Sequence, residues 1–318
     1  MTNYKTQCRW LIRAALAIAA SMSLAAQQPK PRPPQSLRLY VFDCGTLRAT
    51  SAENYSLKKE EIAETSISIP CSLVAHPKGT MIWDTGIIPD AQFKPGGGPV
   101  TAGITTSPAP LLTQLAAAGY SPADITYLAL SHYHGDHVAN ANAFAQSTWL
   151  VAKAERDFMF SDPPPAPASA ANYSALRNSK TVLITDDEYD VFKDGTVIIK
   201  SAPGHTPGHQ VLFLKLEKTG PLLLSGDLYH YPEERTLNRL RVREFNRDQT
   251  AASRLAVEAF IKKTGAQLWI GHDLRTYTKL KKASASPPFQ GGVVREADGV
   301  VNPSSSQGGQ GVRLPVAT

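Results

Sequence analysis

Short apolar runs recur along the chain, and their spacing predicts alternating strands and helices. Residues 65–75 alternate between apolar and polar positions, which is typical of a strand. Two stretches, residues 111–116 and 246–263, have apolar residues every three or four positions and end near a glycine, which predicts helices. This order predicts an α/β fold in which two β-sheets pack face to face with helices outside. Further strands are predicted at residues 39–42, 80–83, 125–130, 148–152, 196–200, 211–214, 222–224 and 268–270.

The segments outside this pattern divide the chain into parts. Residues 1–25 combine three early cations with an apolar run too short to span a bilayer, which predicts a secretory signal peptide and a periplasmic or secreted protein. An uncleaved anchor is the alternative. Residues 26–36 are expected to be a proline-rich linker and residues 37–284 the folded domain. Residues 285–318, rich in Gly, Ser, Pro and Gln, are expected to be a disordered tail.

The overall charge is mild once the signal segment is set aside. Half of the formal charge of +6 belongs to Lys5, Arg9 and Arg13, and the remaining cations are scattered. This argues against nucleic acid as a partner, and no membrane segment is expected in the mature protein. Two cysteines remain in the domain, Cys44 and Cys71. They could form a disulfide in an oxidising compartment or stay free and buried, and the sequence favours neither.

The strongest chemical signal is a cluster at residues 131–137, directly after the apolar run 125–130. Three imidazoles and a carboxylate lie within six residues, and such groups would desolvate or repel one another if nothing lay between them. A divalent metal ion is the simplest solution, because neutral imidazole and carboxylate are its usual nitrogen and oxygen ligands. The cluster consists of His132, His134, Asp136 and His137.

Other polar residues also follow the ends of predicted strands. Since loops at one edge of a sandwich can converge, we expect these residues to meet the cluster at one site. Asp84 is expected to support neighbouring loops through backbone N–H groups rather than to bind metal. A helix is expected to begin at residues 138–144, and residues 90–104 are expected to form a loop. The remaining strand-end residues of this kind are His205, His209, Asp227 and His272.

These motifs resemble those of the metallo-β-lactamase fold hydrolases. The His-x-His-x-Asp-His motif stands at residues 132–137 and the Gly-His-Thr-x-Gly-His loop at residues 204–209, and the resemblance extends over residues 37–282. Within that fold the chain is most similar to N-acyl-homoserine lactonases. The resemblance implies an αββα sandwich of two mixed sheets. It also implies two metal ions. The first would bind His132, His134 and His205, and the second Asp136, His137 and His272. Asp227 would bridge the two ions, and His209 would support the site.

The resemblance implies two divalent ions, with Zn²⁺ the expected metal, and seven ligands are indeed too many for one zinc ion. The expected reaction is the opening of a lactone ring by a metal-bridging hydroxide, with Asp136 transferring a proton. The expected partner is thus a small lactone, as in quorum quenching. The chain differs from these lactonases at a substrate-contacting tyrosine three residues after the bridging aspartate. His230 stands there with Tyr229 beside it, and either could contact the substrate.

Other functions remain open at this point. Glyoxalase II-like thioesterases share the whole ligand set, but the polar tail cannot form their basic C-terminal helical region. The β-lactam hydrolases fit an exported protein, yet they lack the full bridging aspartate. A metal-holding protein without activity would be expected to lack Asp136 or a ligand, and none is missing. The acyl-chain preference and the oligomeric state are not predicted.

Overall fold

A computed structural model of the chain describes residues 31–165, 170–285 and 300–301. The chain divides into two units, Met1–Arg32 and Pro33–Thr318, and the helices and strands of the described residues belong to the second. The expected signal peptide at residues 1–25 lies outside the described residues. Residues 31–36 of the expected linker contain no helix or strand, and the first strand begins at Arg38.

The larger sheet is mixed, with an antiparallel half from β4 to β3 and a parallel half from β3 to β8. The short strand β14 (Val300–Val301) pairs in parallel with β1. It lies within the expected tail, of which residues 286–299 and 302–318 are outside the described ranges. In spatial order the other strands are β4 (Val100–Ala102), β5 (Thr105–Ser107), β1 (Arg38–Leu47), β2 (Ile67–His76), β3 (Gly79–Trp83), β6 (Tyr127–Ala129), β7 (Thr148–Ala152) and β8 (Thr181–Ile184).

The smaller sheet is also mixed, because β12 and β13 are parallel and its other neighbours are antiparallel. The carboxyl ends of β10, β12 and β13 therefore lie at the same edge of this sheet. In spatial order its strands are β13 (Gln267–Trp269), β12 (Gly220–Leu224), β11 (Gln210–Leu216), β10 (Val197–Ser201) and β9 (Glu188–Asp190).

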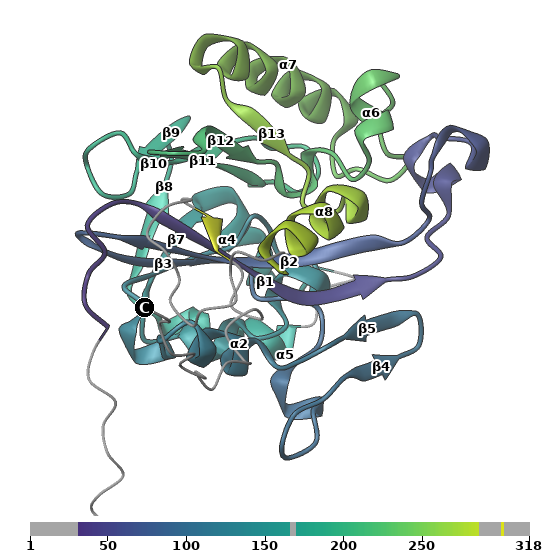
Figure 1. Ribbon diagram of the computed structural model, residues 1–318. Coiled ribbons are helices and arrows are strands. Elements are labelled where there is room, and N and C mark those ends of the chain that lie inside the picture. Colours follow the sequence, from purple (N-terminus) through teal and green to yellow (C-terminus); the bar gives the residue numbers. More distant parts are fainter. Residues whose placement is uncertain (1–30, 166–169, 286–299, 302–318) are drawn as a thin grey trace, which may run out of the picture. The chain divides into compact units, whose positions relative to one another are not determined.

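Helices cover the outer faces of both sheets. Figure 1 shows α7 (Arg247–Thr264) over the smaller sheet, and α2 (Leu111–Ala117) and α5 (Ala170–Tyr173) beyond the larger one. The other helices are α3 (Gly135–Val138), α4 (Lys153–Met159), α6 (Pro232–Thr236) and α8 (Leu274–Ala285), and the 3₁₀ turns are η1 (Ala52–Tyr55), η2 (Lys59–Glu61), η3 (Asp90–Gln92), η4 (Pro122–Asp124), η5 (Ala141–Phe144), η6 (Ser174–Asn178) and η7 (Gly226–Leu228).

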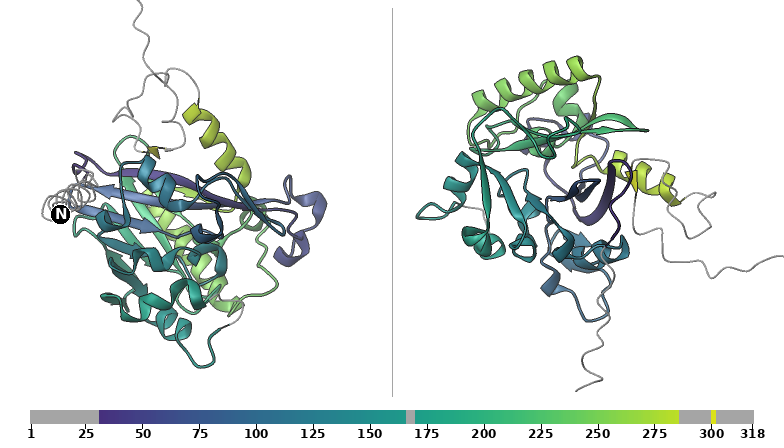
Figure 2. Two further views of the ribbon diagram at one scale, coloured as in Figure 1. Left: turned by 90° about the horizontal axis from the view of Figure 1, so that it is seen from below. Right: turned by 90° about the vertical axis from the view of Figure 1, so that its left-hand side faces the viewer.

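Alternating side chains of the strands build the separate layers. Leu39 and Val41 of β1 belong to the core between the sheets, while Tyr40 and Phe42 belong to the core under the helices of the larger sheet. On β11, Leu212 and Leu214 face the larger sheet, whereas Val211 and Phe213 pack with Val257 of α7. Successive residues of a strand point to opposite faces, so strands covered on both sides are apolar throughout. The layers are visible one above another in the right-hand view of Figure 2.

The predicted αββα sandwich is confirmed, and each predicted strand overlaps an observed one. Helix α7 follows its sequence signals closely, because the side chain of Asn246 accepts a hydrogen bond from Gln249 N and Gly265 ends the helix with a φ of 69°. Residues 90–104 contain η3 and β4, and residues 138–144 form only short turns. Among the elements that were not predicted are α4, α5, α6, α8 and β8. None of the helices in the described ranges is long and apolar enough to cross a membrane.

Cys44 and Cys71 form a disulfide between β1 and β2, which resolves the alternatives left open by the sequence. Both residues lie in the core under the larger sheet. The loop after β3 packs directly on this bond, because a Cβ atom at Gly86 would lie 2.9 Å from the Cβ of Cys44. The disulfide therefore supports the loop that carries Asp84.

Replacing Cys44 and Cys71 together with alanine is expected to lower the free energy of unfolding by about 3 kcal/mol, since the bond restricts the unfolded chain. The two cysteines are 27 residues apart. Denaturant titration under oxidising conditions measures the change. Reduced wild-type protein, which keeps both sulfur atoms, is the control and should approach the variant. Equal stability of oxidised wild type and variant would contradict the prediction.

Candidate metal centre

Five loops at the carboxyl ends of strands converge on one place. From the larger sheet, Asp84 follows β3 and residues 131–137 follow β6, which is the parallel neighbour of β3. From the smaller sheet, His205, Asp227 and His272 follow β10, β12 and β13. All the residues predicted to hold metal are brought together, so the site lies at the shared edge of the two sheets.

The first group of donor atoms comes from three histidines and Asp227. The Nδ1 atom of His134 lies 2.9 Å from Nε2 of His132 and 3.0 Å from Nε2 of His205. The Oδ2 atom of Asp227 lies 3.6 Å and 3.2 Å from the same two Nε2 atoms. These four atoms surround one point, as ligands of a single ion do.

The second group shares Asp227 and adds Asp136, His137 and His272. The Oδ1 atom of Asp227 lies 3.1 Å from Nε2 of His137 and 3.0 Å from Nε2 of His272. Oδ2 of Asp136 lies 3.6 Å from each of these nitrogens. Asp227 therefore presents one carboxylate oxygen to each group. Within each group the ligand atoms lie within 4.8 Å of one another.

The outward-facing nitrogens of the imidazoles are held by neighbouring acceptors. Nδ1 of His137 is 3.0 Å from Oδ2 of Asp84, and Nδ1 of His205 is 3.1 Å from Oε2 of Glu244. His272 uses Nδ1 to reach the carbonyl oxygen of Ser68 at 2.7 Å. Such contacts fix the tautomer, so that the opposite nitrogen carries the lone pair that a metal ion needs.

His209 has a different task, because both of its ring nitrogens are used within the protein. Nδ1 lies 3.0 Å from the carbonyl oxygen of Ala202, and Nε2 accepts a hydrogen bond from the backbone N–H of Asp227 at 2.9 Å. Burial lowers the pKa of His209 to about 3, so the ring is neutral. His209 therefore orients Asp227 and has no nitrogen left for an ion.

Glu155 ties the two histidine-bearing loops together. Its carboxylate accepts hydrogen bonds from the backbone N–H of Tyr133 and from that of Gly208, both at 2.8 Å. The backbone of residue 208 comes so close to α4 that only glycine fits, since a Cβ atom at Gly208 would lie 2.5 Å from the backbone nitrogen of Glu155. Burial raises the pKa of Glu155 to about 7. This buried contact sets the spacing between residues 132–134 and residues 205–209.

The electrostatics of the cluster fit divalent ions. Burial alone would raise the pKa of Asp227, but the imidazoles of His272 and His137 hold it well below its ordinary value, so the carboxylate is ionised. Its Oδ1 atom and the Nε2 atoms of those two histidines are buried and make no hydrogen bond within the described residues. Unpaired buried polar atoms are costly, and an ion between them would pair all three.

The two candidates for substrate contact lie in different surroundings. His230 belongs to the centre, because its Nε2 is 3.0 Å from Oδ2 of Asp227 and its ring stacks on His272 with centres 5.3 Å apart. Tyr229 lies apart, since its hydroxyl donates to Oε1 of Glu258 on α7 at 3.1 Å. The geometry therefore favours His230 over Tyr229.

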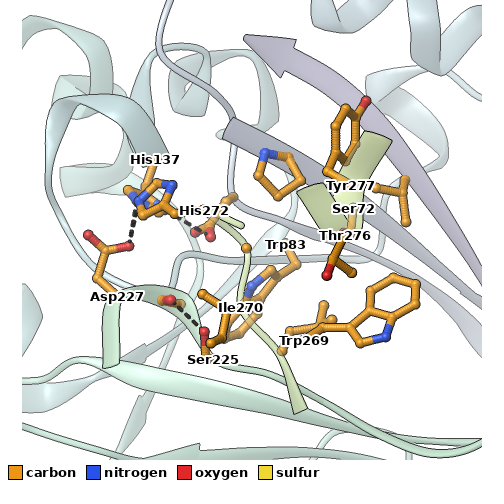
Figure 3. A pocket seen from close by; sticks show the side chains of 16 residues that line it. Ser72, Trp83, His137, Ser225, Asp227, Trp269, Ile270, His272, Thr276 and Tyr277 are labelled. Carbon is orange, nitrogen blue, oxygen red and sulfur yellow. Dashed lines mark hydrogen bonds and ion pairs between the residues drawn. The ribbon is translucent and has the colours of Figure 1, made fainter. Parts of the chain in front are cut away.

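A cavity of about 50 Å³ adjoins the second group from inside the sandwich. Figure 3 shows His137, Asp227 and His272 at one end and Trp269, Thr276 and Tyr277 at the other. This volume holds about three or four water molecules. Asp136 does not line it and has 20% of its side chain exposed, against 4% for Asp227. A substrate therefore has access from the side of Asp136.

Residues 67–278 match the family model of the Metallo-beta-lactamase superfamily, and the chain belongs to this superfamily. The N-acyl homoserine lactonase AttM of Azorhizobium caulinodans is 30% identical over 265 residues, which are 78% of this chain and 97% of the relative. The N-acyl homoserine lactonase of a Bacillus species is 27% identical over 250 residues, covering 74% of this chain and 93% of the relative.

A solved structure of an N-acyl homoserine lactone hydrolase, with N-hexanoyl-L-homoserine bound at its catalytic metal centre, has the same fold. Its TM-score is 0.61 at 21% identity, over 77% of this chain and 96% of that chain. The resemblance predicted from the sequence is thereby confirmed at the level of family and fold.

Three residues that contact the centre were not predicted from the sequence: Glu244, Glu155 and Tyr55. Glu244 lies in an irregular segment and Glu155 on a short helix, so neither follows a strand end as the ligands do. Tyr55 of η1 packs on His230 with ring centres 4.7 Å apart, although 175 positions separate them. No local signal marks these residues, because their role depends on contacts between distant loops.

Changing Asp84→Asn is expected to weaken binding of one of two metal ions about ten- to a hundredfold, because the carboxylate that orients His137 is lost. Titration of the metal-free protein with Zn²⁺ against a competing chelator measures both affinities. Asp273→Asn is the matched control, since Asp273 bonds to Arg275 N and Thr276 on α8 and to no ligand atom. Unchanged affinity of both ions in Asp84→Asn would contradict the orienting role.

Proposed function

We propose that this protein is a metal-dependent hydrolase that opens the lactone ring of N-acyl homoserine lactones. The observation that carries the proposal is the shared carboxylate of Asp227, which presents one oxygen to each of two donor groups. The names of the relatives support the substrate class, because they are N-acyl homoserine lactonases that match over three quarters of this chain. Ring opening would give a hydroxy acid, whose carboxyl group ionises at neutral pH.

The residues present fit two divalent ions, for which we propose zinc. His132, His134 and His205 would hold one, Asp136, His137 and His272 the other, and Asp227 both. When bound, such ions polarise an ester carbonyl and lower the pKa of a water molecule towards neutrality. A dizinc lactonase, AidC, has the same fold, with a TM-score of 0.50 at 20% identity over 77% of this chain and 90% of that chain.

Asp136 is proposed to move the proton. Burial would raise its pKa, but the neighbouring His137 holds it below the ordinary value, so the carboxylate is ionised and can accept a proton from the attacking water. The ester C–O bond then breaks and the ring oxygen leaves as an alkoxide, to which Asp136 returns the proton. Its partial exposure places it where a substrate can reach it.

His230 is proposed to donate a hydrogen bond to the substrate, where the similar lactonases have a tyrosine. Its position is fixed by Glu234, whose Oε2 accepts from the backbone N–H groups of His230 and Tyr231. Tyr55 covers one face of the imidazole. A donor held in this way next to Asp227 can stabilise charge that develops on an ester oxygen.

A row of aromatic rings supports an apolar acyl chain. It begins beside His134 with Tyr133, whose ring centre is 4.7 Å away, and continues to Phe158 at 5.5 Å. Phe245 follows at 5.4 Å from Phe158 and is 57% exposed. An exposed aromatic next to a polar site is a candidate contact for an apolar ligand. The row leads from the first donor group to the surface.

The thioesterase and β-lactam alternatives are not favoured, because the relatives reported above are lactonases. We further propose that the protein acts outside the cytoplasm. The disulfide between Cys44 and Cys71 supports this, since such bonds persist in oxidising compartments.

The purified protein loaded with Zn²⁺ is expected to hydrolyse N-hexanoyl homoserine lactone in preference to a cephalosporin and to lactoylglutathione. Initial rates for this panel measure the preference. Asp227→Ala is the negative control and should lose at least one metal equivalent together with nearly all activity, because both donor groups depend on that carboxylate. A preference for the lactam or the thioester would overturn the lactonase proposal, and retention of both ions in the variant would overturn the bridge.

His230→Ala is expected to lower kcat/KM for this lactone about tenfold to a hundredfold, because a donor to the reacting ester is removed. His230→Tyr is expected to recover part of the loss, since a phenol can also donate. Metal content measured for each variant separates this effect from the loss of an ion. Full activity of His230→Ala would show that the imidazole does not touch the substrate.

A further inference from the structure

The segment between α6 and α7, residues 237–246, lies across the first donor group. The backbone N–H of Val242 donates to the carbonyl oxygen of Asn54 at 2.8 Å, and that of Asn246 donates to the carbonyl oxygen of Gly204 at 2.8 Å. Glu244 reaches Nδ1 of His205 from the same segment. Contacts with two separate loops therefore fix this segment next to the centre, and with it the side chain of Arg241.

Arg241 is a cation without a hydrogen-bond acceptor among the described residues. Its Nε atom is buried and makes no hydrogen bond in the part of the chain that the structure describes. Its guanidinium carbon lies 5.7 Å from the centre of the Tyr55 ring. Two other arginines near the centre differ, because Arg235 pairs with Glu258 and Arg254 with Glu234. Leaving a buried polar nitrogen unpaired is costly, so the position of Arg241 suits an acceptor that arrives from outside.

Tyr55 adds a second donor beside Arg241. Its ring contacts both Arg241 and the imidazole of His230, whose Nε2 is 3.0 Å from Oδ2 of Asp227. Its hydroxyl makes no hydrogen bond within the described ranges, and burial raises its pKa, so it stays a neutral O–H donor. A guanidinium and a phenol thus stand side by side at the rim of the centre, each with a free donor.

We propose that Arg241 and Tyr55 bind the amide carbonyl oxygen of the acyl group. They would then be specificity-determining residues for lactones with an acylamino group on the carbon next to the ester carbonyl. This inference rests on the proposed lactonase function. A simple lactone has no such oxygen, so it leaves both donors unpaired. A site built to hydrogen-bond a substrate group discriminates against analogues that lack it.

The test compares kcat/KM for N-hexanoyl homoserine lactone and for γ-butyrolactone, which lacks the acyl amide. Arg241→Met keeps the length of the side chain and removes its donors. We expect it to lower the ratio of the two kcat/KM values about tenfold to a hundredfold, as for loss of a hydrogen bond to a charged group. Tyr55→Phe removes one oxygen atom and is expected to lower the same ratio several-fold.

Arg243→Met is the matched control. Arg243 is exposed, lies in the same segment and has the same charge, so this change tests long-range attraction alone and should leave the ratio unchanged. A ratio that stays constant in Arg241→Met, or in a folded Tyr55→Phe should Arg241→Met not fold, overturns the inference. An equal effect of Arg243→Met overturns it too. Failure of the zinc-loaded wild type to open either lactone would instead contradict the proposed function.

Discussion

The structure depends on the neutralisation of one buried carboxylate. The oxygens of Asp227 lie within 3.0 to 3.6 Å of nitrogens from five imidazoles, and its side chain is only 4% exposed. Burying an isolated carboxylate in such a place would cost much free energy, and burying five imidazoles without partners would also be costly. Because the imidazoles come from four loops on two sheets, neither sheet can form this centre alone. The packing between the sheets is therefore also what holds the charges together.

The loops of the centre are connected by side chains rather than left to solvent. Glu155 bonds to the backbone of two ligand loops at once, and His209 holds the backbone N–H of Asp227. Asp84 connects two parts of the cluster at residues 131–137. Its carboxylate accepts a hydrogen bond from the backbone N–H of Ser131 and lies 3.0 Å from Nδ1 of His137. Each of these residues is buried, so each bond forms where water cannot replace it. This explains how loops without regular structure can present ligand atoms at fixed spacing.

Much of this could be predicted from the sequence, and the reasons for success and failure are physical. The strands were readable because a strand buried on both faces is apolar throughout. The convergence of the candidate ligands was readable because they follow strand ends at short, fixed spacings. Glu244 and Tyr55 were not readable, because each acts through a partner on a loop far away along the chain. The same limit applied to the two cysteines, whose pairing depends on the register of β1 against β2. Sequence patterns report local burial and local spacing, whereas these contacts arise only when separate elements pack.

The outer helix layer is connected to the metal centre through one buried ion pair. Arg254 of α7 donates to the carbonyl oxygen of Leu228 at 2.9 Å and to Oε1 of Glu234 at 3.0 Å. Glu234 in turn holds the backbone of His230, so the position of that imidazole depends on how α7 packs on the smaller sheet. Removing one partner of such a buried pair would leave an uncompensated charge beside the centre. The helix layer, which covers the sheet on the side away from the larger sheet, is thus linked to the imidazole beside Asp227 by a short chain of contacts through Glu234.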